Sequence, residues 1–190
     1  MKIRNWTAAG VLGLMTLALA AQAPNAGVVA ASLAETMKSI QNELSQVGKL
    51  NFVIHTRDKE GGNATVEYST EVSNVATDPA SCTVQYHRKR WMGGEVASDE
   101  DVSFSLREVL GLSVMTVEQH EKAIFEKEKT SPEDRQALHM QFDPPMLMVV
   151  ARKAGDKEEG FAFTDEQMAR RAAKAIGRGV ELCGGKNVPY

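Results

Sequence analysis

Two cysteines have the most definite chemistry in this chain. Cys82 and Cys183 are the only cysteines among its 190 residues. In an oxidising compartment, two cysteines most simply form one disulfide bond. We therefore predict a Cys82–Cys183 disulfide. Two buried free thiols are the next alternative, and a redox or nucleophilic cysteine is the third, since the chain has no Cys-x-x-Cys motif.

The histidines and acidic residues do not form a recognisable catalytic or metal-binding motif. The pair His120-Glu121 lacks the second histidine of a zinc-protease helix. His139 and Asp143 have a spacing that could place both on one metal ion, but two ligands do not make a site. We expect no catalytic residue, no metal site and no cofactor.

Basic residues gather at two places. The run from His87 to Trp91 lies within an expected strand, where neighbouring side chains alternate between the two faces, so we interpret it as a solvated strand end rather than one patch. Arg170, Lys174 and Arg178 recur at helical spacing and form a basic stripe on one face of the last expected helix. We predict this stripe as a binding face; the alternative is the solvated side of an amphipathic helix.

The N-terminus has the pattern of an export signal. Lys2 and Arg4 precede an uncharged apolar run, and small residues follow it. We predict a signal peptide over residues 1–23 with cleavage after Ala20, a flexible tail over 24–31, and one globular domain over 32–187. The apolar run is shorter than the roughly 20 residues that span a bilayer, so we expect no stable membrane anchor after cleavage. The expected location is the periplasm or the extracellular medium.

The charge balance limits the partners. The formal net charge is −3 at pH 7, and loss of Lys2 and Arg4 with the signal peptide makes it more negative. Nucleic acids and anionic membranes favour basic surfaces. We therefore expect no nucleic-acid partner.

Two helices bound the expected domain. Ser32 and Glu35 form a capping box, and apolar residues recur at helical spacing up to Val47, so we predict a helix over 32–47 that ends at Gly48. Thr164 and Gln167 form a second capping box before a long helix with small apolar residues on one face, which ends at Gly184-Gly185.

Between the helices the hydrophobic period changes to two, which is typical of strands. We predict seven strands at about 50–54, 66–72, 81–91, 102–106, 112–119, 146–152 and 161–163. The first two form a hairpin. We interpret residues 99–101 as a turn and residues 120–143 as a long exposed loop with a short helix beginning near Ser131.

This order of elements resembles the pleckstrin-homology fold, in which a bent seven-stranded barrel or sandwich is closed by one C-terminal helix. The ending FAFTDEQMARRAAKAIGRGVELCGG, residues 161–185, is also similar to the endings of uncharacterised exported bacterial proteins. The expected fold class is thus α+β, mainly antiparallel and pleckstrin-like, with an additional N-terminal helix. The resemblance implies either phosphoinositide binding or peptide binding in a groove beside the last helix.

Two classes of function remain open. The first is a non-enzymatic interaction module of the bacterial envelope that binds a peptide, a partner protein or a small apolar ligand. The second is an envelope hydrolase or metal-dependent enzyme whose site is assembled from residues far apart in the sequence. The lack of any catalytic motif favours the first class.

Overall fold

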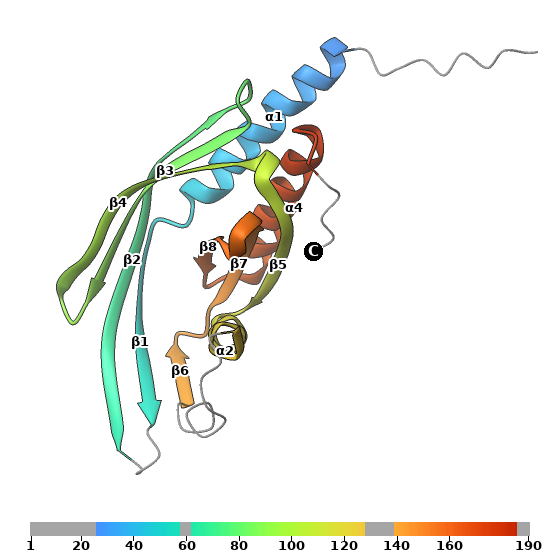
Figure 1. The fold of residues 1–190 in the computed structure, drawn as a ribbon. Helices are drawn as coiled ribbons and strands as arrows, with labels where there is room; N and C mark the ends of the chain where they lie inside the picture. The colour runs from blue at the N-terminus through green and yellow to red at the C-terminus, as the bar shows by residue number, and fades with distance from the viewer. Residues whose placement is uncertain (1–25, 58–61, 128–138, 186–190) are drawn as a thin grey trace, which may run out of the picture.

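The computed structural model describes residues 26–57, 62–127 and 139–185. Within these ranges the protein is a mixed α+β fold with three α-helices and two antiparallel sheets, one of five strands and one of three. The five-stranded sheet is long and curved, and both terminal helices and the smaller sheet lie on one side of it (Figure 1). We call that side its inner face and the opposite side its outer face.

Helix α1, Ala26–Ser45, opens the described fold. It begins at Ala26 rather than at the expected Ser32, because the alanine-rich sequence before Ser32 contains nothing that stops a helix. Ser32 is therefore inside the helix, where its carbonyl accepts a hydrogen bond from Thr36 Oγ1 at 2.8 Å, and the predicted capping box is wrong. The predicted stop is confirmed, since Gly48 has a φ of +55°, which favours glycine.

The five-stranded sheet has the order β4-β3-β2-β1-β6. Its strands are β1 Lys49–Arg57, β2 Asn63–Asp78, β3 Thr83–Met92, β4 Glu95–Ser105 and β6 His139–Asp143. The predicted hairpin of the first two strands is confirmed by an antiparallel register from Lys49 opposite Glu71 to Arg57 opposite Asn63. Gly93 and Gly94, both with positive φ, make the expected turn between β3 and β4.

Two parts of this sheet differ from the sequence-based expectation. Residues 99–101 are not a turn: Asp99, Glu100 and Asp101 lie in β4 opposite Lys89, Arg88 and His87 of β3. Opposite charges across a strand pair offset the poor strand propensity of acidic residues. The segment 120–143, expected as a loop, contains most of α2 and all of β6, and the helix expected near Ser131 lies outside the described residues.

The three-stranded sheet has the order β5-β7-β8. Its strands are β5 Val109–Thr116, β7 Leu147–Lys153 and β8 Glu158–Phe163; the short 3₁₀ turns η1 Leu106–Glu108 and η2 Ala154–Asp156 flank them, and α2, Val117–Lys127, follows β5. Strand β7 is central, which agrees with its nearly continuous apolar sequence.

Helix α4, Glu166–Leu182, packs against α1 and the smaller sheet. Its N-cap is Asp165 rather than Thr164, with Oδ1 accepting from the Met168 N–H at 2.7 Å. Gly179 provides the close approach to α1, because a Cβ there would lie 2.7 Å from Ile40 Cδ1. The largest core cluster of the described residues joins these two helices to both sheets, and within it the rings of Tyr86 and Phe161 are in contact.

The pleckstrin-like architecture is not confirmed. The described residues form eight strands rather than seven, and they divide into two separate sheets, neither of which closes into a barrel. Element order along a sequence does not determine strand pairing, and here the short strand β6 adds to the edge of β1 while β5 leaves the large sheet after η1. Among the residues described, no helix combines the length and apolar character needed to cross a lipid bilayer.

Candidate functional site

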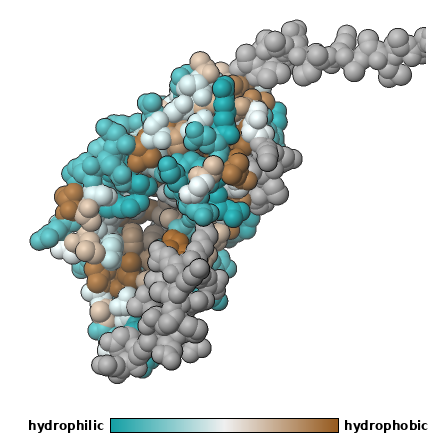
Figure 2. Space-filling model, in the orientation of Figure 1, coloured by the Kyte–Doolittle hydropathy of each residue, from teal (hydrophilic) through white to brown (hydrophobic). Residues whose placement is uncertain are grey.

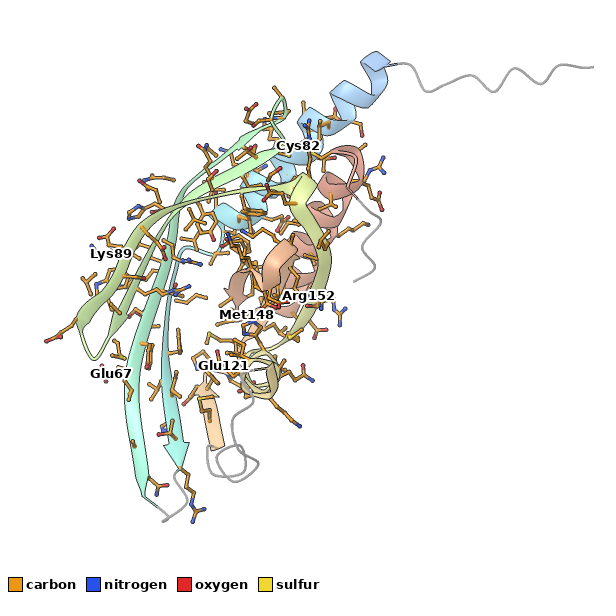
Figure 3. The ribbon with its side chains drawn as sticks, viewed as in Figure 1. Glu67, Cys82, Lys89, Glu121, Met148 and Arg152 are labelled. Carbon is orange, nitrogen blue, oxygen red and sulfur yellow. A yellow bond between two sulfur atoms is a disulfide. The ribbon has the colours of Figure 1, made fainter. Side chains whose placement is uncertain are left out.

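The basic run of β3 is divided between the two faces of the five-stranded sheet, as strand alternation predicts. His87, Lys89 and Trp91 lie on the outer face, where Lys89 is labelled in Figure 3. Tyr86 enters the core, so Arg88 and Arg90, at two and four residues from it, share the inner face with it. The run is therefore not one basic surface.

On the outer face the positive charges have acidic partners. Lys89 Nζ lies 2.8 Å from Asp99 Oδ2, and the His87 ring contacts Asp99 at 3.0 Å and Asp101 at 2.9 Å. The hydrogen bond with Asp101, aided by the charge of Asp99, raises the pKa of His87. The hydrogen bond from Lys89 lowers the pKa of Asp99. This face is a set of neutralised cross-strand pairs, which offers little attraction to a polyanion.

On the inner face, five polar side chains form a connected cluster between the two sheets. Tyr86 Oη donates to Glu159 Oε2 at 3.1 Å, and Lys153 Nζ donates to Glu159 Oε1 at 2.8 Å. Arg88 donates through Nε and Nη2 to Glu100 Oε1, at 3.1 and 2.9 Å. Burial, followed by the charge of Glu159, raises the pKa of Tyr86. Each charge in this cluster has an opposite partner, so its evident role is to join the two sheets.

Arg90 is the exception on this face. It forms no hydrogen bond or ion pair with any residue that the structure describes, although it is only two residues from the paired Arg88. Burial lowers the pKa of its guanidinium, and the positive charge of Arg88 lowers it further. An arginine remains protonated under such conditions. Arg90 is thus an exposed cation on the inner face that has no ion pair among the described residues, while the charges of Glu100 and Glu159 favour its protonated form.

Polar neighbours surround Arg90 along one row of the sheet. Its cross-strand partners are Ser98 on β4 and Thr70 on β2, and Thr70 in turn lies opposite Leu50 on β1. Ser98 Oγ is buried without a hydrogen-bond partner among the described residues. A bulge follows at once, because Trp91 pairs with Val96 instead of Ala97. Bulges redirect side chains and are frequent beside functional sites.

The next row of the inner face is apolar. Met92 lies opposite Tyr68, and Tyr68 lies opposite Phe52, with their rings stacked at a centroid distance of 5.7 Å. Phe52 also contacts Phe142 of β6, at 6.1 Å. Met92 is 50% exposed, while Phe52 and Tyr68 are half-buried. The protein thus leaves an aromatic surface partly covered.

The smaller sheet faces this row. Met148, labelled in Figure 3, is a partly buried member of the cluster that contains Phe142, Phe52 and Ile54. Gly160 of β8 leaves room for it, since a Cβ there would lie 2.6 Å from Met148 Cε. The surface is hollowed between the two sheets, with apolar side chains beside the hollow (Figure 2). We refer to Arg90, Thr70, Ser98, Met92, Tyr68, Phe52 and Met148 as the inner-face site.

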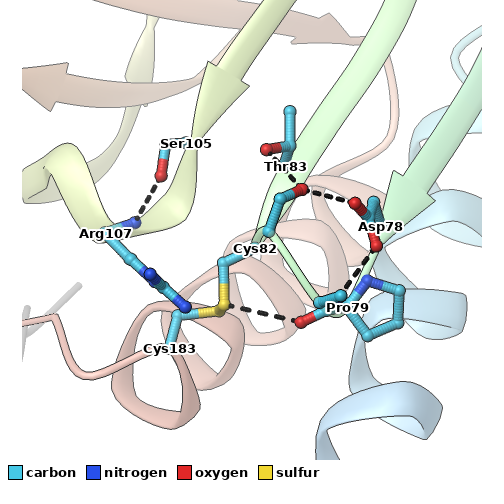
Figure 4. The surroundings of a disulfide bond; sticks show 9 residues. Asp78, Pro79, Cys82, Thr83, Ser105, Arg107 and Cys183 are labelled. Carbon is cyan, nitrogen blue, oxygen red and sulfur yellow. Dashed lines mark hydrogen bonds between the residues drawn. A yellow bond between two sulfur atoms is a disulfide. The ribbon is translucent and has the colours of Figure 1, made fainter.

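The predicted disulfide is present. Cys82 and Cys183 are bonded, with Cα atoms 6.0 Å apart and a sequence separation of 101 residues. Cys82 lies in the turn before β3, not on the strand itself, and has a φ of +59°. Cys183 caps the C-terminus of α4 (Figure 4). The bond therefore fixes the end of the last helix to the β2–β3 turn.

The predicted basic stripe lies on the exposed side of α4. Arg170 pairs with Glu166 at 2.7 Å and Arg178 pairs with Glu181 at 2.9 Å, so acids of the same helix accompany two of its three cations. Lys174 is exposed. The stripe is remote in sequence from the inner-face site, and binding through it stays a prediction.

The histidines considered as metal ligands lie on different elements. His120 Nε2 lies 3.1 Å from Glu158 Oε2, whereas Asp143 is at the end of β6 and the His139 side chain lies outside the described atoms. Within the described part of the chain, no group of three or more His, Cys, Asp or Glu residues is placed to hold a metal ion.

Comparison of the chain with protein-family models, with curated proteins and with solved structures found no match. The inner-face site rests on geometry alone. Strand alternation in the sequence indicates that Arg88 and Arg90 lie on the opposite face from His87 and Lys89. Arg90 differs from Arg88 in its cross-strand neighbours Ser98 and Thr70, and this register depends on contacts between strands.

Proposed function

We propose that this protein is a non-enzymatic binding module of the bacterial envelope that holds a small apolar ligand at the inner-face site. The observation that carries the proposal is the partly exposed row Met92, Tyr68 and Phe52, whose last member packs with Met148 of the smaller sheet on one apolar cluster. Ligand sites are typically concave and apolar, with a few polar groups that orient the ligand.

The position of α1 favours this face over the last helix. In a pleckstrin-like domain the peptide groove lies beside the C-terminal helix. Here α1 packs against α4, with Glu43 of α1 bonded to Arg171 of α4 at 3.2 Å and Ile40 packed against Gly179. Helix α1 therefore covers part of the α4 surface that would line such a peptide groove.

Binding of a neutral apolar probe tests the proposal. N-phenyl-1-naphthylamine fluoresces strongly only in an apolar site, and we expect it to bind the purified protein. Met92→Glu places a charge on the apolar row and should weaken probe binding about tenfold or more, which corresponds to roughly 1.4 kcal/mol or more.

Val96→Glu is the matched control. Val96 is 54% exposed, similar to Met92, but it lies opposite Trp91 on the outer face of the same hairpin. We expect this variant to bind the probe like the wild type. No binding by the wild-type protein, or equal weakening by both substitutions, would contradict the proposal.

A further inference from the structure

The inner-face site combines an unpaired cation with an apolar surface, and this combination specifies a ligand more closely than either feature alone. Arg88 bonds to Glu100, whereas Arg90 forms no hydrogen bond or ion pair with a described residue, although the charges of Glu100 and Glu159 act on it. Arg90 is exposed, and a guanidinium binds a carboxylate or a phosphate through a planar fork of N–H donors.

Three hydrogen-bonding side chains lie on adjacent strands at this point. Ser98, Arg90 and Thr70 are direct cross-strand neighbours on β4, β3 and β2. Adjacent strands are about 4.8 Å apart, so the three side chains span roughly 10 Å, which suits one headgroup of a few oxygen atoms. Ser98 Oγ lacks a partner in the described structure, which is unfavourable for a buried hydroxyl unless another group supplies the bond.

The apolar row begins next to this group. Met92 is two residues after Arg90 on β3, and Tyr68 is two residues before Thr70 on the antiparallel strand β2, which corresponds to about 7 Å along a strand. Phe52 and Met148, which pack against the buried Phe142, continue the apolar surface toward the smaller sheet. A molecule with its anionic end on Arg90 would therefore place a hydrocarbon chain on this surface.

We propose that the ligand is a single-chain amphiphile with an anionic headgroup, bound with its headgroup on Arg90, Thr70 and Ser98 and its hydrocarbon chain on Met92, Tyr68 and Phe52. This inference rests on the proposed function and specifies the chemistry of its ligand. The shared chemistry is a carboxylate or a phosphate on an alkyl chain. A fatty acid would supply the first, and a lysophospholipid-type headgroup the second.

Displacement of the neutral fluorescent probe by ligands of equal chain length tests this inference. Dodecanoate, dodecyl phosphate and neutral monododecanoylglycerol are compared below their micelle concentrations. We expect one or both anions to displace the probe at concentrations roughly ten- to a hundred-fold lower than the neutral ligand requires. The preferred anion distinguishes the fatty-acid source from the phosphate source.

Arg90→Gln should remove this preference, so that the anions and the neutral ligand displace the probe at similar concentrations. Arg90→Lys should retain part of it, and Thr70→Val should reduce it severalfold. Lys89→Gln is the matched control, because it removes the adjacent cation from the outer face of the same strand. The Lys89→Gln variant should keep the full preference for anionic over neutral ligands. Added salt should weaken this preference in both Lys89→Gln and the wild type.

Failure of the inference is distinguishable from failure of the proposed function. Equal displacement by charged and neutral ligands, or an unchanged preference in Arg90→Gln, overturns the anionic headgroup while the apolar site stands. Absence of probe binding overturns both. Displacement by a hydrophobic peptide with a free C-terminal carboxylate, but by neither alkyl anion, also overturns the amphiphile proposal.

Discussion

Arg88 and Arg90 show how two identical residues on one strand acquire different roles. Arg88 meets Glu100 across the strand pair, whereas the corresponding neighbour of Arg90 is Ser98. A serine cannot neutralise a guanidinium. Nothing in the sequence near Arg90 signals this difference, because the identity of its neighbours depends on the register between β3 and β4.

The cysteine pair could be predicted because the chain offers only one pairing. In the chain-entropy model, closing a loop with a separation of 101 residues stabilises the fold by roughly 4–5 kcal/mol, and strain lowers that figure. We expect the Cys82→Ala/Cys183→Ala double variant to lose a few kcal/mol of unfolding free energy in urea titrations.

Wild-type protein treated with a reductant is the control for this substitution and should show a similar loss. Complete reaction of the unreduced, denatured protein with a thiol reagent would show that the disulfide is absent, and the prediction would then be wrong.

His87 should make stability depend on pH near neutrality. Its pKa is raised in the folded protein, so the stabilisation from its carboxylate contacts is fully present below its unfolded pKa of about 6.5 and is lost as pH rises through the folded value. We expect the melting temperature at low salt to fall between about pH 6 and pH 8, and to fall less in His87→Gln.

His55→Gln is the control for this measurement, since the His55 ring contacts the hydroxyl of Thr65 rather than a carboxylate. Its melting profile should follow that of the wild type. Superimposable profiles for the wild type and His87→Gln would show that the outer-face contacts of His87 contribute nothing measurable.

At the scale of the elements, hydrophobic alternation correctly predicted β1, β2 and β3, because apolar side chains on one face mark a half-buried strand. It failed for the acidic part of β4, whose stability comes from the opposite charges of β3. It also missed β6, a five-residue strand that depends on pairing with distant β1. Local patterns do not record such long-range partners.

Helices α1 and α4 depend on a close approach at Gly179. A side chain there would meet Ile40 Cδ1 at 2.7 Å and Leu106 Cδ1 at 2.9 Å. We expect Gly179→Val to lower the unfolding free energy by about 1–3 kcal/mol through overpacking, measured by urea denaturation.

Lys174→Val is the matched control, because Lys174 is on the exposed side of the same helix. It places the same side chain on α4 without entering the contact with α1 and should change stability by less than about 0.5 kcal/mol. If both variants lose the same free energy, the α1–α4 contact tolerates a larger residue and the prediction is wrong.

In the molecule as a whole, contacts between residues far apart in the sequence hold the helices and the two sheets together. The disulfide joins α4 to the β2–β3 turn, and the Arg171–Glu43 pair joins α4 to α1 across 128 residues of sequence. Lys153 and Tyr86 meet on Glu159 to join the two sheets. The acidic net charge of −3 does not favour anions in general, so anion binding depends on the local field of Arg90.

The architecture of the whole molecule could be predicted only in part from the sequence. The α+β class follows from the hydrophobic pattern. The division into two sheets with a hollow between them follows from the pairing of β6 with β1 and the departure of β5, neither of which has a local signal. The basic stripe of α4 was recognisable from helical spacing, whereas the inner-face site required the strand register.

Methionine-methyl NMR during titration with dodecanoate and dodecyl phosphate detects ligand binding at the inner-face site itself, with resonances assigned by single Met→Leu substitutions. We predict that at least one of these ligands shifts the Met92 and Met148 resonances with a common saturation curve. Met37, fully buried in the core, and Met168, on α4, should not shift. Unchanged Met92 and Met148 resonances with both ligands at saturating concentration would contradict the account.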